Sequence, residues 1–124
     1  MKTLLALAAV VLALAGCSSQ ADQQREAADA LVTHLQRIHT GDFAGACELI
    51  DPTIRDYGMP CVQQLQQQWP QQQRDELVNI AVDSSRVDVK NTHARIPGAA
   101  ITFNGHPNPG DYELRKIDDH WLVG

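Results

Sequence analysis

The amino-acid sequence predicts an α+β domain in which helices come first and antiparallel strands follow. Two observations predict this class. Apolar residues recur at helical spacing from residue 22 to residue 69, and they alternate with polar residues from residue 85 onward. Turn-forming pairs, Asn91-Thr92, Asn104-Gly105 and Asp118-Asp119, then divide the second half into short strands.

The first helix is expected over residues 22–40, where one face of a helical wheel is apolar, and Gly41 is typical of the residue that ends a helix. Asp42 is a good cap for a short second helix that ends before Asp51-Pro52. The apolar positions of these two helices are Ala27, Ala28, Leu31, Leu35, Ile38, Phe43, Ala46, Cys47 and Ile50.

A third helix is expected to have Pro60 at its first position and to end at Pro70. Its apolar stripe consists of Cys61, Val62, Leu65 and Trp69, and the glutamines among residues 63–73 form its wet face. A disordered low-complexity tract is the alternative interpretation of these glutamines. Residues 75–82 fit either a helix or a first strand, and we favour the helix.

The remaining residues predict an antiparallel sheet of about four to five strands. Alternation and turn signals place these strands at residues 86–90, 93–96, 99–103, 112–117 and 120–123. Pro107 and Pro109 extend the Asn104-Gly105 turn into a loop. Together with the helices, this sheet makes one domain with one core.

The N-terminus contains a more specific signal. Leu14-Ala15-Gly16-Cys17 follows an apolar stretch that begins after Lys2 and is too short to span a bilayer. This tetrapeptide resembles the lipobox of bacterial lipoproteins, which implies diacylglyceryl transfer to Cys17 and cleavage before it. An ordinary secretory signal and an uncleaved membrane helix are the alternatives.

The lipobox resemblance implies a division of the chain. Residues 1–16 are the signal peptide, residues 17–24 are the lipidated cysteine with a short polar tether, and residues 25–124 are the single domain. Two acyl chains give durable anchoring at the extracytoplasmic face of the cell membrane. In a cell with two membranes, Ser18 in place of an aspartate implies sorting to the outer membrane.

Charge and cysteine content narrow the function. Without Lys2 the chain has nine Lys and Arg against 15 Asp and Glu, which argues against binding to nucleic acid. Once Cys17 is lipidated, Cys47 and Cys61 remain as an even pair in an oxidising compartment, and they predict a disulfide. Two buried free thiols are the alternative. No histidine lies close enough in sequence to either cysteine to indicate zinc.

A family resemblance rests on a few residues between positions 27 and 123. These are Gly41-Asp42 and Ala46-Cys47 after the first helix, Cys61, and the ending from Leu114 to Ile117 and from Trp121 to Val123. In this arrangement the chain resembles small exported members of the nuclear transport factor 2-like superfamily. The resemblance implies a cone of helices on a curved sheet, with a cavity that different relatives use for catalysis, ligand binding or dimerisation, and a homodimer through the open sheet face.

Candidate active-site residues are scattered. His34 and His39 flank the apolar stripe of the first helix on opposite edges, so they cannot easily share a metal, and we expect both at the solvent edge. His34 is nevertheless the one candidate catalytic base for a cavity. Asp118-Asp119-His120 is interpreted as a solvated turn. Tyr57 and Tyr112 fit a cavity site and a packing role with a solvated hydroxyl equally well. The chain contains no motif that predicts a metal site, a cofactor or a named enzyme class.

Three functions follow from this sequence. The first is a non-catalytic lipoprotein that binds a small apolar ligand or an envelope protein. Its aromatic side chains line the cavity or pack the core: Trp69, Phe103, Tyr112 and Trp121. The second is an isomerase- or dehydratase-type enzyme with His34 or a nearby carboxylate as its base. The third is a structural surface protein with a filled core.

The lipid anchor predicts a simple release experiment. Cys17→Ser removes the thiol that receives the lipid, so the protein is expected to leave the membrane fraction as a soluble precursor or secreted form. Fractionation followed by salt and carbonate washing measures this. A Cys17→Ser protein that stays on the membrane after both washes contradicts the anchor.

Overall fold

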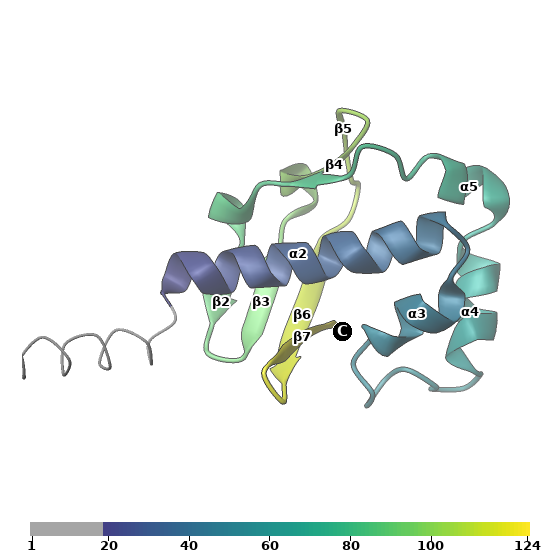
Figure 1. Ribbon diagram of the computed structural model, residues 1–124, viewed down its shortest axis with the longest axis horizontal. Coiled ribbons are helices and arrows are strands. Elements are labelled where there is room, and N and C mark those ends of the chain that lie inside the picture. Colours follow the sequence, from purple (N-terminus) through teal and green to yellow (C-terminus); the bar gives the residue numbers. More distant parts are fainter. Residues whose placement is uncertain (1–18) are drawn as a thin grey trace, which may run out of the picture.

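The computed structural model describes residues 19–124 and has an α+β architecture, with helices before strands as predicted (Figure 1). The expected leader, with Leu14, Ala15 and Gly16, and the expected lipidation site Cys17 lie outside these residues. The helices of the described part are α2 (Gln20–His39), α3 (Phe43–Glu48), α4 (Cys61–Gln68) and α5 (Gln71–Asp75).

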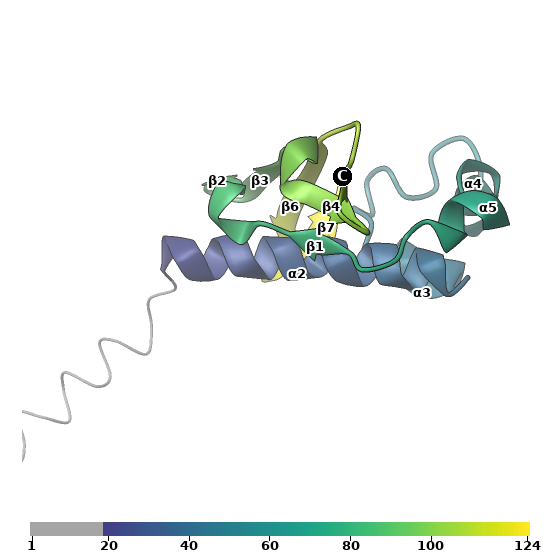
Figure 2. The ribbon, with the colours of Figure 1, turned by 90° about the horizontal axis from the view of Figure 1, so that it is seen from above.

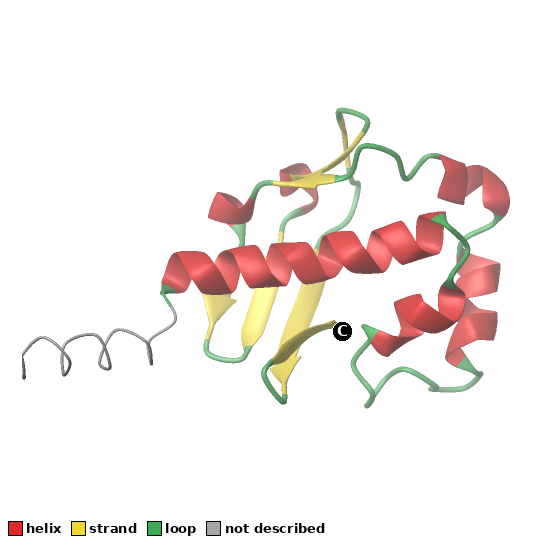
Figure 3. Cartoon of the chain, viewed as in Figure 1, coloured by secondary structure: helices red, strands yellow, loops and turns green. Residues whose placement is uncertain are grey.

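The strands form two antiparallel sheets (Figure 3). The larger sheet has the order β2 (Asp88–Lys90), β3 (His93–Ile96), β6 (Tyr112–Ile117), β7 (His120–Val123). The smaller has the order β1 (Ala81–Val82), β4 (Ile101–Phe103), β5 (His106–Pro107). Short 3-10 turns, η1 (Ser84–Arg86) and η2 (Gly98–Ala100), precede β2 and β4.

The two sheets replace the single curved sheet that we expected. After β3 the chain turns at η2, and β4 then pairs with β1 and β5 instead of extending the larger sheet. Gly98 allows this turn, because a Cβ there would lie 2.5 Å from the Asn108 carbonyl oxygen and 2.6 Å from that of Gly110. The predicted hairpins are confirmed: β2 pairs with β3, and β6 pairs with β7 about Asp118 and Asp119, both at positive φ.

Both ends of α2 are fixed by local hydrogen bonds. The Ser19 hydroxyl accepts from the backbone N–H of Asp22 at 3.1 Å. At the other end, Gly41 has φ +79°, and the N–H of Asp42 donates to the Arg37 carbonyl at 2.9 Å, which closes the turn as a Schellman motif. The expected end of this helix is therefore confirmed.

The start of α2 corrects our expectation of a tether through residue 24. Residues 20–24 are helical, and they are held against the sheet by two glutamine side chains. The Gln20 amide donates to the Val89 carbonyl at 3.1 Å, and the Gln24 amide donates to that of Val87 at 2.8 Å. Composition alone suggested a linker, but a capped helix start with good helix formers outweighs it.

The core lies between α2 and the strands, and α2 runs along one side of both sheets in Figure 2. Its largest fully buried side chains are Leu31, Leu35, Ile38, Ile96, Ile101 and Leu114. Every buried hydrophobic residue of this core lies between Ala27 and Trp121. A chain that begins at Ser19 therefore retains the whole core and can be studied by itself.

The short helices gather at the C-terminal end of α2 (Figure 1). Asp42 caps α3 as predicted, by accepting from the Gly45 N–H at 2.9 Å. Pro60 occupies the N-cap position just before α4 and makes no side-chain capping hydrogen bond, whereas we expected it at the first helical position. Val62 was wrongly assigned to the apolar stripe, since it is 37% exposed while Cys61 and Leu65 are buried.

Residues 75–82 do not form the helix that we favoured. Helix α5 ends at Asp75, Asn79 has φ +51°, and Ala81–Val82 pairs with β4 as a strand. The β-branched side chains of Val78, Ile80 and Val82 suit extended backbone better than a helix. The competing strand interpretation is correct for Ala81–Val82 only, since residues 76–80 form neither a helix nor a strand.

A disulfide between Cys47 and Cys61 joins α3 to α4, which confirms the predicted pairing. The two residues are 14 positions apart, and both side chains are buried. In residues 19–124, no helix combines the length and apolar character needed to cross a membrane.

Loss of this disulfide is expected to destabilise the domain. For a closed loop of this length the chain-entropy model gives about 3 kcal/mol, so Cys47→Ser/Cys61→Ser is expected to lower the free energy of unfolding by about that amount. Urea denaturation of the 19–124 chain measures it, and the same double variant under reducing conditions is the control. An unchanged unfolding midpoint in the variant contradicts a stabilising role.

Candidate functional site

A pocket of about 260 Å³ opens where the helical end of the molecule meets the larger sheet. Its walls come from α2, α4, the loop that follows α3, and the ends of β6 and β7. Ile50, Ile54, Leu65, Trp69 and Val123 provide the apolar part of the lining. Residues from five elements of the fold therefore meet at this place.

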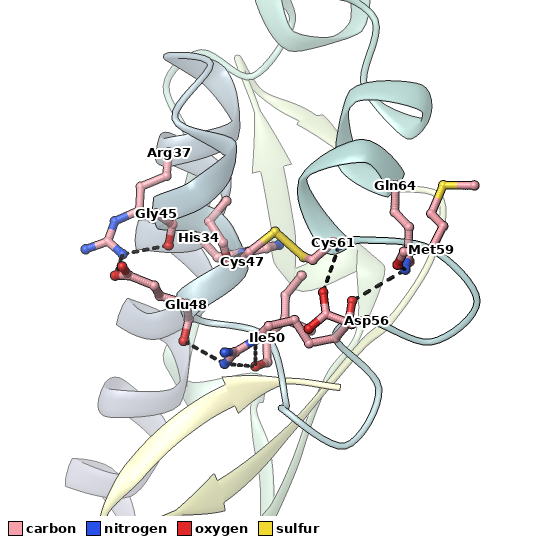
Figure 4. The surroundings of a disulfide bond; sticks show 12 residues. His34, Arg37, Gly45, Cys47, Glu48, Ile50, Asp56, Met59, Cys61 and Gln64 are labelled. Carbon is pink, nitrogen blue, oxygen red and sulfur yellow. Dashed lines mark hydrogen bonds and ion pairs between the residues drawn. A yellow bond between two sulfur atoms is a disulfide. The ribbon is translucent and has the colours of Figure 1, made fainter.

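His34 is the buried polar residue of this pocket. We expected it at the solvent edge of α2, and this is wrong: the residue is only 4% exposed. It lies three residues after Leu31 and four before Ile38, so it shares their buried face. Figure 4 shows its ring beside the disulfide.

The tautomer of His34 follows from its hydrogen bond. Nδ1 lies 2.9 Å from the carbonyl oxygen of Ala46, which can only accept. Nδ1 must therefore carry the proton, and in the neutral ring Nε2 is left with a lone pair. Burial lowers the pKa of His34, and the Arg37 charge lowers it further, against an opposing effect of the bond to Ala46. The ring is neutral at pH 7.

Tyr112 and Trp69 complete the aromatic part of the pocket. Tyr112 is the first residue of β6 and lies opposite Ile96 of β3. Burial raises the pKa of its hydroxyl, so this group stays protonated and can both donate and accept hydrogen bonds. Trp69, the residue that ends α4, is half-buried.

The loop that forms one wall is held by side chains that bind its own carbonyl groups (Figure 4). Arg55 donates through Nη2 to the Ile50 carbonyl at 2.8 Å and to that of Glu48 at 3.4 Å. From α4, the Gln64 amide donates to the carbonyls of Tyr57, at 3.2 Å, and Met59. These bonds fix the shape of the wall.

Asp51 anchors the same loop to the sheet. Its Oδ2 lies 3.2 Å from Nε of Arg115 on β6, and its Oδ1 accepts from the backbone N–H and the hydroxyl of Thr53. Burial by itself would raise the pKa of Asp51, but the Thr53 hydrogen bonds and the charges of Arg115 and Arg55 outweigh it, and the pKa is lowered. Asp51 is a structural ion-pair residue of the loop.

Other candidate residues lie elsewhere. His39 is exposed at the end of α2, where Nδ1 donates to the Arg74 carbonyl at 2.7 Å. Trp121 belongs to the core, and Asp118-Asp119-His120 is exposed at its turn, as predicted. Phe103 lines a different hollow, between α5 and β5. Tyr57 is 86% exposed and is not a packing residue.

Sequence reasoning missed the polar wall residues Arg55, Gln64 and Gln68. For Gln64 a signal was present: it stands three residues after Cys61, which places it on the same side of α4, and it is half-buried instead of fully solvated. Arg55 lies in an irregular loop, where no periodicity indicates direction.

Among residues 19–124, no three His, Cys, Asp or Glu side chains come close enough to share a metal ion. Comparisons with protein-family models, with characterised proteins and with solved structures found no match to this chain. The geometry of the pocket is therefore the basis for any functional argument.

The burial of His34 predicts a pH dependence of stability. Its pKa is lowered in the folded state from about 6.5, the value for an unfolded chain, so below pH 6.5 the unfolded state binds the proton first. The free energy of unfolding is expected to fall as the pH drops from 7 to 5, and the fall is expected to be smaller in His34→Asn. Urea denaturation across this range measures both slopes.

The carboxylates with lowered pKa, Asp22, Asp51 and Asp111, lose their contribution to stability mainly below about pH 5, as the pH falls past the ordinary aspartate pKa of about 3.9. They are present in both the wild-type chain and His34→Asn. Equal slopes for the wild-type chain and His34→Asn would show that His34 contributes nothing to this dependence.

Proposed function

We propose that this protein is a lipid-anchored extracytoplasmic binding protein that takes a small apolar ligand into the pocket at His34. The observation that carries the proposal is the pocket itself, in which apolar side chains and a polar wall of Arg55, Gln64 and Gln68 surround one buried neutral histidine. Ligand sites in proteins commonly combine a mostly apolar lining with a few placed polar groups. The pocket of about 260 Å³ is slightly smaller than their usual size of about 300–1,000 Å³, which favours a small ligand.

Two further observations support the location. The Cys47–Cys61 disulfide is typical of an oxidising, extracytoplasmic compartment. The lipobox-like Leu14-Ala15-Gly16-Cys17 supports attachment to the outer face of the membrane, or to the outer membrane in a cell that has two. Because residues 20–24 belong to α2, the tether between lipid and domain is short, and the domain stands close to the bilayer.

We also retain the nuclear transport factor 2-like cone as a proposal. A long first helix packed on antiparallel strands, with a pocket at one end, supports it. The division of the strands into two sheets differs from the single curved sheet of that fold. A homodimer through the open sheet face remains part of the same proposal.

A protein of the envelope is the second candidate partner. Exposed hydrophobic side chains lie at the end of the domain that is remote from the start of α2 (Figure 1): Ile54 and Tyr57 on the loop that follows α3, and Val62 on α4. Exposed apolar groups of this kind are typical of interaction surfaces when they are contiguous.

An enzymatic role for the same pocket ranks lower. Nε2 of His34 is left as an acceptor by the hydrogen bond at Nδ1, and a general base requires such a lone pair. Its lowered pKa, however, reduces its affinity for a proton, whereas a general base works best with a pKa near the ambient pH. Binding uses the same lone pair without that requirement.

The proposed function predicts that blocking the pocket mouth abolishes ligand retention. Ile54 lines the pocket and is 47% exposed, so Ile54→Trp adds bulk there without entering the core. We expect wild-type chain from an oxidising compartment to carry a small molecule in native mass spectrometry, and Ile54→Trp to carry at least tenfold less of it.

Val62→Trp is the matched control, because it introduces the same indole at an exposed position that does not line the pocket. Retention in Val62→Trp should equal that of the wild-type chain. Equal loss in both variants, or a ligand-free wild-type chain, argues against a ligand in this pocket and favours the protein partner.

A further inference from the structure

The chemistry of the pocket restricts the ligand further than its apolar lining does. His34 offers a hydrogen-bond acceptor there. The N–H of the neutral ring is on Nδ1 and donates to the Ala46 carbonyl at 2.9 Å, so Nε2 keeps its lone pair. A ligand that covers Nε2 without giving it a hydrogen-bond partner is unfavourable, so the lone pair on Nε2 favours a ligand that brings a donor. The ligand therefore needs an O–H or N–H group next to an apolar body.

Charged ligands suit this pocket poorly. Of the described residues, no side-chain carboxylate lines it, so no side chain of this lining would pair with a cation. Arg55 is the one cationic side chain of the described lining, and its Nε and Nη2 atoms already donate to the carbonyls of Ile50 and Glu48. A carboxylate also has no proton to donate, and the lone pair on Nε2 repels it.

Resting on the proposed binding function, we infer that the ligand is a neutral amphiphile whose apolar body fills the pocket and whose hydroxyl donates to Nε2 of His34. Tyr112 lines the same pocket and its hydroxyl can donate to the ligand oxygen. An apolar cavity of about 150 Å³ accommodates benzene, so about 260 Å³ has room for an aromatic alcohol of two fused rings.

Three probes of one shape test this inference on the oxidised 19–124 chain. They are 2-naphthol, which donates a hydrogen bond, 2-methoxynaphthalene, which cannot, and the anion 2-naphthoate. Titration calorimetry gives each dissociation constant at pH 7.5. We expect 2-naphthol to bind about tenfold tighter than the methyl ether, the effect of about one hydrogen bond, and 2-naphthoate to bind most weakly.

Two variants of His34 separate its two nitrogen atoms. In His34→Asn the amide nitrogen takes the place of Nδ1 and keeps a donor for Ala46, but nothing replaces Nε2. In His34→Gln the longer side chain brings an amide oxygen to the place of Nε2. The ratio of the two neutral dissociation constants is expected to fall about tenfold in His34→Asn and to recover in His34→Gln.

A measurement on the wild-type chain does not depend on either variant folding. The ¹⁵N resonance of Nε2 of His34 is expected to move upfield on addition of 2-naphthol and to stay in place with the methyl ether, because only the naphthol donates to it. A resonance that responds equally to both probes overturns the inference.

The outcomes distinguish this inference from the proposed function. If neither neutral probe binds up to its solubility limit, the binding function fails, and the inference fails with it. If both bind and His34→Asn leaves their ratio unchanged, the pocket binds ligands but His34 does not select a donor. Tightest binding of 2-naphthoate overturns the neutral ligand and assigns the selectivity to Arg55.

Discussion

The helical end of this molecule depends on the covalent bond between Cys47 and Cys61. Helix α3 has six residues and α4 has eight, and helices of this length are not stable alone in water. The disulfide holds the two together, with their Cα atoms 6.1 Å apart. The Ala46 carbonyl accepts the hydrogen bond from Nδ1 of His34, and Ala46 directly precedes Cys47. Cys61 lines the pocket, so one covalent bond positions two walls of the site.

The opposite wall is supplied by α2, whose buried stripe is interrupted by a single imidazole. An aliphatic side chain at position 34 would continue the stripe of Leu31, Leu35 and Ile38 and would need no hydrogen bond. The imidazole requires a partner, and the short helix α3 provides one in the Ala46 carbonyl. The fold thus provides a hydrogen-bond partner for Nδ1, and this bond fixes the orientation of the ring and therefore the position of Nε2.

Local chemistry made much of the fold predictable. Gly41 and Asp42 end one helix and cap the next through hydrogen bonds that involve only nearby residues, and Asp118-Asp119 forms its turn for the same reason. The pairing of β4 with β1 was not predictable, because it depends on the close backbone approach at Gly98. The helix start at Gln20 depends likewise on a strand reached much later in the chain.

The candidate site was predictable only in part for a related reason. A helical wheel places His34 at the edge of an apolar stripe, but tertiary packing decides whether that edge faces water or another helix. Here the disulfide-linked pair α3 and α4 covers it, which turns a surface position into a buried one. A buried histidine departs from the rule that the core-facing side of a helix is apolar. Such departures are expected at sites where binding requires a polar group. Strand β6 and helix α4 bring Tyr112 and Trp69 to the same pocket as His34. Packing of the core alone does not require these polar and aromatic groups to meet there.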